Sequence, residues 1–122
     1  MKKIAILGST GSIGRSLLNL IKKDKKNFKI ILLTANRNYK KLFEQANEFK
    51  VKNLIITDKK IFFKIKNKSK FKKKYNIFND YNSFNKIFTS KVDYLMSSIT
   101  GIDGLVPTFK SIKFTKKIAI AN

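Results

Sequence analysis

The chain contains no cysteine, no histidine and no tryptophan among its 122 residues. Without cysteine it can form neither a disulfide nor a thiolate nucleophile, and cysteine metal sites are excluded. Without histidine it lacks the most common general base and the most common metal ligand. Its seven carboxylates are scattered over predicted helices and loops, which argues against a metal cluster. Composition and spacing therefore do not reveal a reaction, and they favour a binding domain.

Long apolar runs are also missing, so no segment of the sequence is predicted to span a bilayer. Residues 1–7 imitate the start of a signal peptide, but the apolar part is only Ile4 to Leu7 and stops at Gly8. That is too short for the apolar region of such a peptide. We therefore expect a cytoplasmic protein with no membrane partner. The length suffices for one domain with a real core.

Acidic residues are scarce, since 28 basic residues stand against 7 acidic ones and the net charge is +21. Such a charge suggests nucleic acid or an anionic membrane as a partner. However, only Arg15 and Arg37 are arginine, whereas nucleic-acid sites usually use arginine forks. Lys, Asn, Ile and Phe share A/T-rich codons, so genome composition can account for the charge. We expect no specific nucleic-acid partner, only salt-sensitive attraction to polyanions.

Apolar runs alternate with segments of helical periodicity along the chain. Strands are predicted at residues 3–7, 28–34, 53–57, 92–97 and 117–121, with a short one at 77–78. Helices are predicted at residues 13–21, 39–49, 59–69 and 102–113, with a small one that begins at residue 80 or 82 and runs to 88. Asp58 is placed to cap the third helix, and Pro107 lies near the start of the last. The order predicts an α/β fold, a Rossmann-like doubly wound, mainly parallel sheet with helices on both faces.

The stretch Gly8-Ser9-Thr10-Gly11-Ser12-Ile13-Gly14 lies where the first predicted strand turns into the first helix. Glycine permits a tight turn and a close approach of the backbone to a pyrophosphate. The free N–H groups of the new helix would face the anion, and the serine and threonine hydroxyls would add donors. The alternative is a strand–helix turn that uses glycine only for its shape. The flanking strand and helix favour phosphate binding.

Four predicted loops meet at the carboxyl edge of the sheet, where such folds bind ligands. They are residues 8–14, 35–38 and 97–101, and Asn122. The second loop contains no carboxylate to bind a ribose hydroxyl, but it contains Arg37, whose guanidinium suits a 2′-phosphate. This favours NADP over NAD, although Arg37 could be one more surface cation. Thr100 and Asp103 form the nearest polar cluster, which we interpret as a helix cap.

Nine lysines lie between Lys59 and Lys74, the densest basic segment of the chain. They could form a face that binds polyanions. They could equally be a solvated helix and loop, which is the usual meaning of a charge run. We prefer the second interpretation and keep a basic polyanion-binding module on a Rossmann-like fold as the alternative function.

Four motifs, in this order and spacing, resemble the 1-deoxy-D-xylulose 5-phosphate reductoisomerase family. Residues 7–14 resemble its amino-terminal signature, and residues 35–38 are similar to its Ala-Gly-Lys-Asn-type loop, with Asn36 for glycine and Arg37 for lysine. Residues 98–105 resemble its Ala-Ile-x-Gly-x-x-Gly-Leu stretch, and residues 118–122 its strand before Ala-Asn-Lys-Glu-Ser. Semialdehyde dehydrogenases share the glycine spacing but use a catalytic cysteine, which this chain lacks.

The resemblance implies the NADPH- and divalent-metal-dependent (Mg or Mn) rearrangement and reduction of 1-deoxy-D-xylulose 5-phosphate to 2-C-methyl-D-erythritol 4-phosphate, in non-mevalonate isoprenoid biosynthesis, by a homodimer. It also implies that residues 10–13 hold the pyrophosphate, residues 36–38 meet the 2′-phosphate, and Asn122 lies at the nicotinamide side. The family's Lys-Glu-Ser and Asp-x-Glu motifs are not in this sequence. We therefore expect residues 1–122 to be the NADPH-binding domain, without the catalytic and carboxyl-terminal domains and inactive alone.

The predicted cofactor site has no catalytic and no metal-binding residue. Its members are Gly8, Thr10, Gly11, Ser12, Ile13, Gly14, Asn36, Arg37, Asn38 and Asn122.

Overall fold

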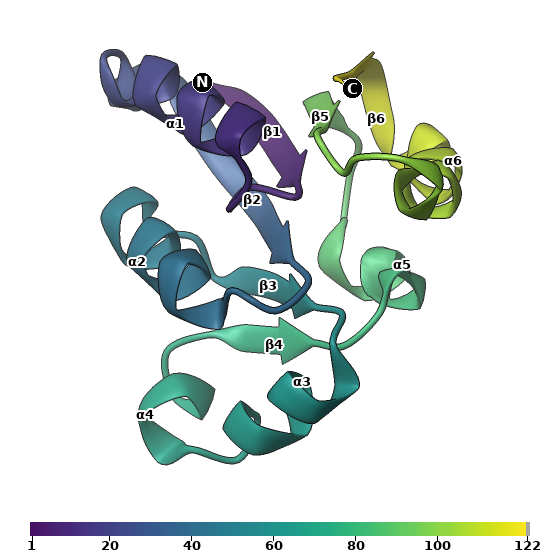
Figure 1. The fold of residues 1–122 in the computed structure, drawn as a ribbon. Helices are drawn as coiled ribbons and strands as arrows, with labels where there is room; N and C mark the ends of the chain where they lie inside the picture. The colour runs from purple at the N-terminus through teal and green to yellow at the C-terminus, as the bar shows by residue number, and fades with distance from the viewer. Residues whose placement is uncertain (122) are drawn as a thin grey trace.

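Six parallel strands form one sheet in the computed structural model, which describes residues 1–121 (Figure 1). The strands are β1 (Lys2–Leu7), β2 (Phe28–Ala35), β3 (Asn53–Ile56), β4 (Asn76–Phe78), β5 (Val92–Ser97) and β6 (Thr115–Ile120). Their order across the sheet is β4-β3-β2-β1-β5-β6, and every neighbouring pair is parallel. The chain therefore winds outward from β1 to one edge and returns to the other side of β1. This confirms the predicted doubly wound architecture.

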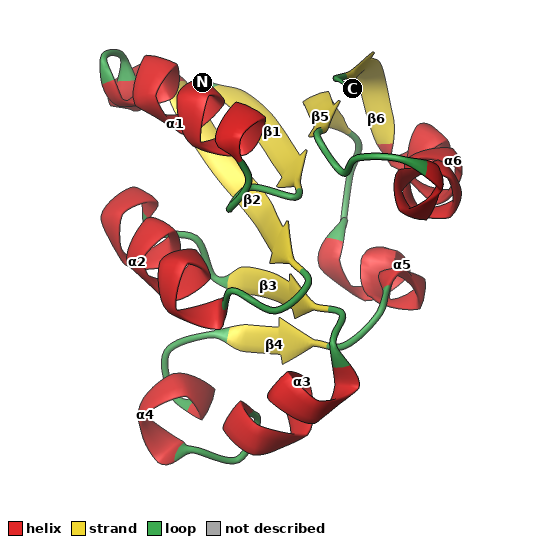
Figure 2. Cartoon of the chain, in the orientation of Figure 1, coloured by secondary structure: helices red, strands yellow, loops and turns green. Residues whose placement is uncertain are grey.

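Helices cover both faces of the sheet (Figure 2). They are α1 (Ser12–Lys22), α2 (Tyr39–Phe49), α3 (Lys59–Ile65), α4 (Ser69–Lys72), α5 (Phe84–Ile87) and α6 (Leu105–Ser111). Short 3-10 turns precede β2 (Lys25–Asn27), α5 (Tyr81–Ser83), α6 (Ile102–Gly104) and β6 (Ile112–Phe114).

The alternating side chains of the strands divide the core between the two faces. On the face of α1 and α2, Ile4 and Ile6 of β1 pack with Leu18 and Ile21 of α1. On the opposite face, Ala5 and Leu7 pack with Phe84 of α5. Both sets are 6% exposed or less, so the central strand is buried from both sides. Continuous apolar runs are typical of such strands, and this is why the sequence pattern identified them.

The predicted helix at residues 59–69 is wrong in its second half, because α3 ends at Ile65 and a separate turn, α4, follows. Lys68 is extended and begins α4, which turns Phe71 toward α2. There Phe71 stacks on Phe43 with ring centroids 4.2 Å apart. The aromatic contact, together with repulsion among close lysines, outweighs continuation of the helix.

The last helix and its surroundings also differ in detail from the prediction. The predicted segment 102–113 consists of α6 flanked by two 3-10 turns, and Pro107 lies in the first turn of α6 as expected. Asp103 caps neither the 3-10 turn at Ile102–Gly104 nor α6, so the interpretation of Thr100 and Asp103 as a helix cap was wrong. Along α6, apolar side chains remain exposed, including Leu105, Val106 and Phe109. No helix within residues 1–121 has the length and apolar character needed to cross a membrane.

Candidate functional site

The glycine-rich stretch joins β1 to α1 and presents the helix N-terminus at the carboxyl edge of the sheet. Gly8 has a positive φ of 76°, and Gly11 is the N-cap residue of α1. The Arg15 N–H donates to the Gly11 carbonyl at 2.9 Å, so the amides of Ser12, Ile13 and Gly14 have no acceptor within the helix. No side chain caps this helix, and its first turn has no acidic residue. Uncapped amides at the positive end of a helix are suited to a phosphate.

Gly14 lets α1 pack directly against the loop that precedes it. A Cβ at Gly14 would lie 2.6 Å from both the Cα and the carbonyl oxygen of Ser9, and 2.7 Å from the Gly8 carbonyl oxygen. A Cβ at Gly11 would meet only the Gly8 carbonyl oxygen, at an ordinary 3.7 Å. Gly14 is therefore required by packing, and its role in the site is to place the helix N-terminus.

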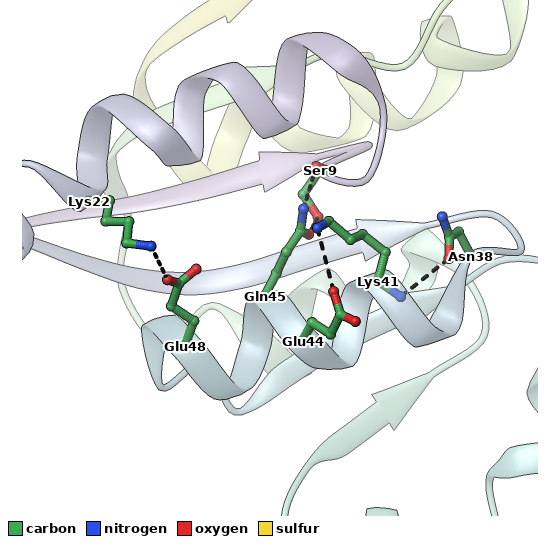
Figure 3. Close-up of polar contacts among 7 residues, drawn as sticks. All are labelled: Ser9, Lys22, Asn38, Lys41, Glu44, Gln45 and Glu48. Atoms are coloured by element: carbon green, nitrogen blue, oxygen red, sulfur yellow. Dashed lines mark hydrogen bonds and ion pairs between the residues drawn. The ribbon is translucent and has the colours of Figure 1, made fainter.

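Ser9 is turned into the protein and is fully buried. Its hydroxyl donates to Gln45 Oε1 at 2.8 Å, and Gln45 Nε2 donates to the Ser9 carbonyl at 3.0 Å (Figure 3). The expectation that the Ser9 hydroxyl adds a phosphate donor was therefore wrong, because the hydroxyl holds the loop onto α2. Thr10 and Ser12, by contrast, face the cleft described below.

Thr34 of β2 supports the same loop from the other side. Its hydroxyl accepts from the Gly8 N–H at 2.9 Å, and its carbonyl accepts from the Ser9 N–H at 2.9 Å. The Tyr81 hydroxyl lies 3.2 Å from Thr34 Oγ1, and burial raises the pKa of this phenol above its usual value, partly offset by the Thr34 hydrogen bond. The loop is thus held in place before any ligand binds.

The loop after β5 closes against the glycine-rich stretch. The Ser98 hydroxyl contacts the carbonyl oxygens of Leu7 at 2.7 Å and Gly8 at 3.0 Å. A Cβ at Gly8 would lie 3.2 Å from the Ile99 nitrogen, so the two loops are in close contact here. The predicted meeting of these loops is confirmed.

A cleft of about 590 Å³ opens between these loops, within the range of small-molecule sites. It lies above the junction of β1 with β2 and β5, where the chain reverses its winding. Its walls come from the ends of β1, β2, β3 and β5 and from the connection before α5. The lining residues are Gly8, Thr10, Gly11, Ser12, Ile13, Thr34, Ala35, Asn36, Thr57, Tyr81, Ser98, Ile99, Thr100 and Asp103.

The structure brings six of the ten predicted cofactor residues into this cleft, namely Gly8, Thr10, Gly11, Ser12, Ile13 and Asn36. Gly14 lies beneath it, and the Asn38 side chain caps α2 by accepting from the Lys41 N–H at 3.2 Å. Arg37 lies on the same loop beside the cleft with its side chain 73% exposed. Asn122 lies outside the described residues.

Sequence reasoning missed five residues that line the cleft or lie beside it: Thr34, Thr57, Asp58, Tyr81 and Asp103. Asp58 is the most consequential, because its Oδ2 lies 3.7 Å from Arg37 Nε. The loop after β2 contains no carboxylate of its own, but Asp58, two residues after the end of β3, places one beside Arg37. Since Thr57 ends a predicted strand and Asp58 directly follows it, the rule that ligands bind at strand carboxyl ends could have found them.

Residues 1–121 contain no group of three or more acidic side chains arranged to hold a metal ion. The lysines of α3 and α4 lie at the β4 side of the sheet, and none of them lines the cleft. Several lysines of the basic segment lie over aromatic rings, such as Lys66, just after α3, over Phe63 at 4.5 Å and Lys70 of α4 over Phe71 at 4.9 Å. The basic segment and the cleft are therefore separate features.

A sequence model described as 1-deoxy-D-xylulose 5-phosphate reductoisomerase matches residues 4–122. Enzymes of that name from Pelagibacter ubique and Clostridium acetobutylicum are 59% and 39% identical, each over 100% of this chain and 32% of the relative. The Zymomonas mobilis reductoisomerase in complex with NADPH superposes with a TM-score of 0.82 and 29% identity, over 99% of this chain and 32% of that one. A reductoisomerase bound to NADPH, fosmidomycin and magnesium gives a TM-score of 0.86 and 27% identity, over 100% and 30%. The chain thus spans about a third of the length of these relatives.

Proposed function

Because the chain belongs to the 1-deoxy-D-xylulose 5-phosphate reductoisomerase family, we propose that its cleft binds NADPH and that residues 1–122 are the cofactor-binding domain of such an enzyme. The observation that carries this proposal is the uncapped N-terminus of α1, which opens into the cleft at the point where the sheet reverses its winding. NADPH complexes of structural neighbours with the same fold support it.

The residues present fit a dinucleotide. The amides of Ser12 and Ile13 and the hydroxyl of Thr10 would hold the pyrophosphate, since they face the cleft without a helix cap between them and the ligand. Asn36 and Arg37 would bind the adenosine 2′-phosphate, and Asn38 would support their loop by capping α2. Asn122 is proposed for the nicotinamide side on the resemblance alone. Bound NADPH would supply the hydride for the reduction.

The activity of the whole enzyme is part of the same proposal: rearrangement and reduction of 1-deoxy-D-xylulose 5-phosphate in isoprenoid biosynthesis, by a cytoplasmic homodimer. The described residues do not fit the divalent metal, because they offer no acidic cluster. We therefore assign the isolated chain cofactor binding and no turnover. We assign it no membrane partner and no specific nucleic-acid partner.

The decisive experiment is a titration of the chain with NADPH and with NADH, followed by intrinsic or nucleotide fluorescence. We expect clear preference for NADPH, and we expect Arg37→Glu to weaken NADPH binding about tenfold or more while leaving NADH nearly unchanged, as for a lost charge-assisted hydrogen bond. Lys26→Glu is the matched control, because it changes the net charge equally at the opposite edge of the sheet, in the turn before β2.

Equal affinity for the two nucleotides would contradict the proposal. So would a Lys26→Glu effect as large as that of Arg37→Glu, since the charge of the whole protein would then be responsible. The basic polyanion-binding module would be favoured instead by tight, steeply salt-dependent binding of an oligonucleotide whose affinity does not change when the glycine-rich stretch is substituted.

A further inference from the structure

We propose that Thr57 and Asp58, which directly follow β3, are positioning residues that set the preference for a 2′-phosphorylated nucleotide by fixing Asn36 and Arg37. This inference rests on the proposed function and extends it to residues that do not themselves contact the phosphate.

Main-chain hydrogen bonds join the two loops beyond the ends of their strands. The Thr57 N–H donates to the Ala35 carbonyl at 3.1 Å, and the Asp58 N–H donates to the Asn36 carbonyl at 3.0 Å. The β2–β3 ladder, which ends with Ala35 opposite Ile56, therefore continues through the loop that is proposed to meet the phosphate. A surface loop with few such bonds would be mobile, whereas this one is held at a set distance from β3.

The side chain of Thr57 orients the side chain of Asn36. Asn36 Nδ2 donates to Thr57 Oγ1 at 2.7 Å, and both residues line the cleft. One amide hydrogen is thereby used, which fixes the direction of the remaining donor and of the carbonyl oxygen. The ordering of this exposed side chain is completed before the nucleotide arrives, so binding does not have to supply it.

Asp58 makes two contacts with its two carboxylate oxygens. Oδ1 accepts from the Ile61 N–H at 3.0 Å and so caps the N-terminus of α3. Oδ2 lies 3.7 Å from Arg37 Nε. The Asp58 side chain is only 22% exposed, against 73% for Arg37. The carboxylate is therefore the fixed partner and the guanidinium the mobile one.

The direction of this contact matters for recognition. The closest atom of Arg37 to Asp58 is Nε, so the two terminal nitrogens are left for the paired contacts that a guanidinium makes with phosphate. A ribose that carries only a 2′-hydroxyl cannot use that fork. Asp58 also repels a phosphate, but its charge is shared between the Ile61 amide and Arg37, so the gain from orienting Arg37 prevails.

Two variants separate this role from a structural one. Asp58→Asn retains the helix cap, because asparagine caps helices as well as aspartate, but it removes the charge that faces Arg37. Thr57→Val retains the shape of the side chain and removes the acceptor for Asn36. Asp80→Asn is the matched control, since the Asp80 side chain also accepts a main-chain N–H, from Asn82 at 2.9 Å, without lining the cleft.

The test is to measure the dissociation constants for NADPH and NADH and the thermal unfolding of every variant. Asp58→Asn and Thr57→Val are each expected to lower the ratio of NADPH to NADH affinity about threefold, with NADH binding and melting temperature nearly unchanged. Asp80→Asn should leave the ratio unchanged. A variant that merely perturbed folding would lower the affinity for both nucleotides together and leave their ratio unchanged.

An unchanged ratio in both variants would overturn this inference, and so would a rise in NADPH affinity on Asp58→Asn, which would show that Asp58 competes with the phosphate for Arg37. These outcomes are distinct from failure of the proposed function. In that case the unsubstituted chain would itself show no preference for NADPH.

Discussion

The substitution Gly14→Ala tests how the glycine-rich stretch builds the site. Its Cβ would lie 2.6 Å from the Cα and the carbonyl oxygen of Ser9, whereas ordinary contacts of this kind begin at 3.4 Å. The atoms that would have to move are main-chain atoms of a loop held by Thr34 and Gln45. We therefore expect α1 to shift away from the loop, because the loop cannot yield.

The size of the effect follows from two opposed terms. Overpacking of a tight contact costs about 1–3 kcal/mol, and the better helix propensity of alanine returns up to about 1 kcal/mol. The net loss of about 1–2 kcal/mol corresponds to a fall in melting temperature of roughly 4–8 °C for a chain of this size. Since the displaced amides would serve the pyrophosphate, NADPH and NADH should both lose affinity, by about tenfold.

Circular dichroism melting and nucleotide titration measure the two effects. Gly11→Ala is the control for stability, because its Cβ would meet nothing closer than 3.7 Å, and its melting temperature should stay within about 2 °C of the original. If Gly14→Ala melted at the original temperature and bound NADPH normally, the packing argument for this glycine would be refuted.

Two further predictions concern groups buried around the loop. Gln45→Leu should lower the free energy of unfolding by about 1–3 kcal/mol in a urea titration, because it leaves the Ser9 hydroxyl and carbonyl buried without Gln45; an unchanged midpoint would show that the pair contributes nothing. Burial raises the pKa of Tyr81 above 10.0, so the folded protein keeps this proton longer than the unfolded chain, and stability present below about pH 10 is lost as the pH rises through the raised pKa. The free energy of unfolding of Tyr81→Phe should therefore fall less than that of the original chain between about pH 9 and pH 11. Equal falls in the two proteins would show that Tyr81 does not cause this loss of stability.

The sequence was sufficient to predict the architecture because its buried strands and amphipathic helices alternate strictly. Parallel strands need covered crossovers, so the order of elements leaves few topologies. The position of the glycine-rich stretch between a strand and a helix was also predicted correctly, because both flanking segments have clear patterns. Where lysines replace an apolar periodicity, as in residues 66–70, the pattern could not show that the helix breaks.

The details of the site depended on distances between segments, which periodicity does not contain. Ser9 and Thr10 are adjacent, yet one faces Gln45 and the other the cleft. Asp58 reaches Arg37 only because β2 and β3 pair in a particular register. Tyr81 belongs to a connection with weak periodicity, and its contact with Thr34 spans the sheet edge. Such contacts are set by tertiary packing and carry no local signal.

The position of β6 at one edge of the sheet has a consequence for self-association. Only one side of this strand pairs with a described neighbour, β5, and such an edge is a template onto which another extended chain can add. Lys116, which pairs with Asp93 at 3.4 Å, and Lys117 place charge on the first half of the strand, whereas the uncharged Ile118 and Ile120 that follow are exposed. Salt that screens the lysines would weaken the charge repulsion between copies at this edge. The exposed apolar half could still pack against another copy. Storage in strong salt would thus promote aggregation of a protein that its net charge otherwise keeps dispersed.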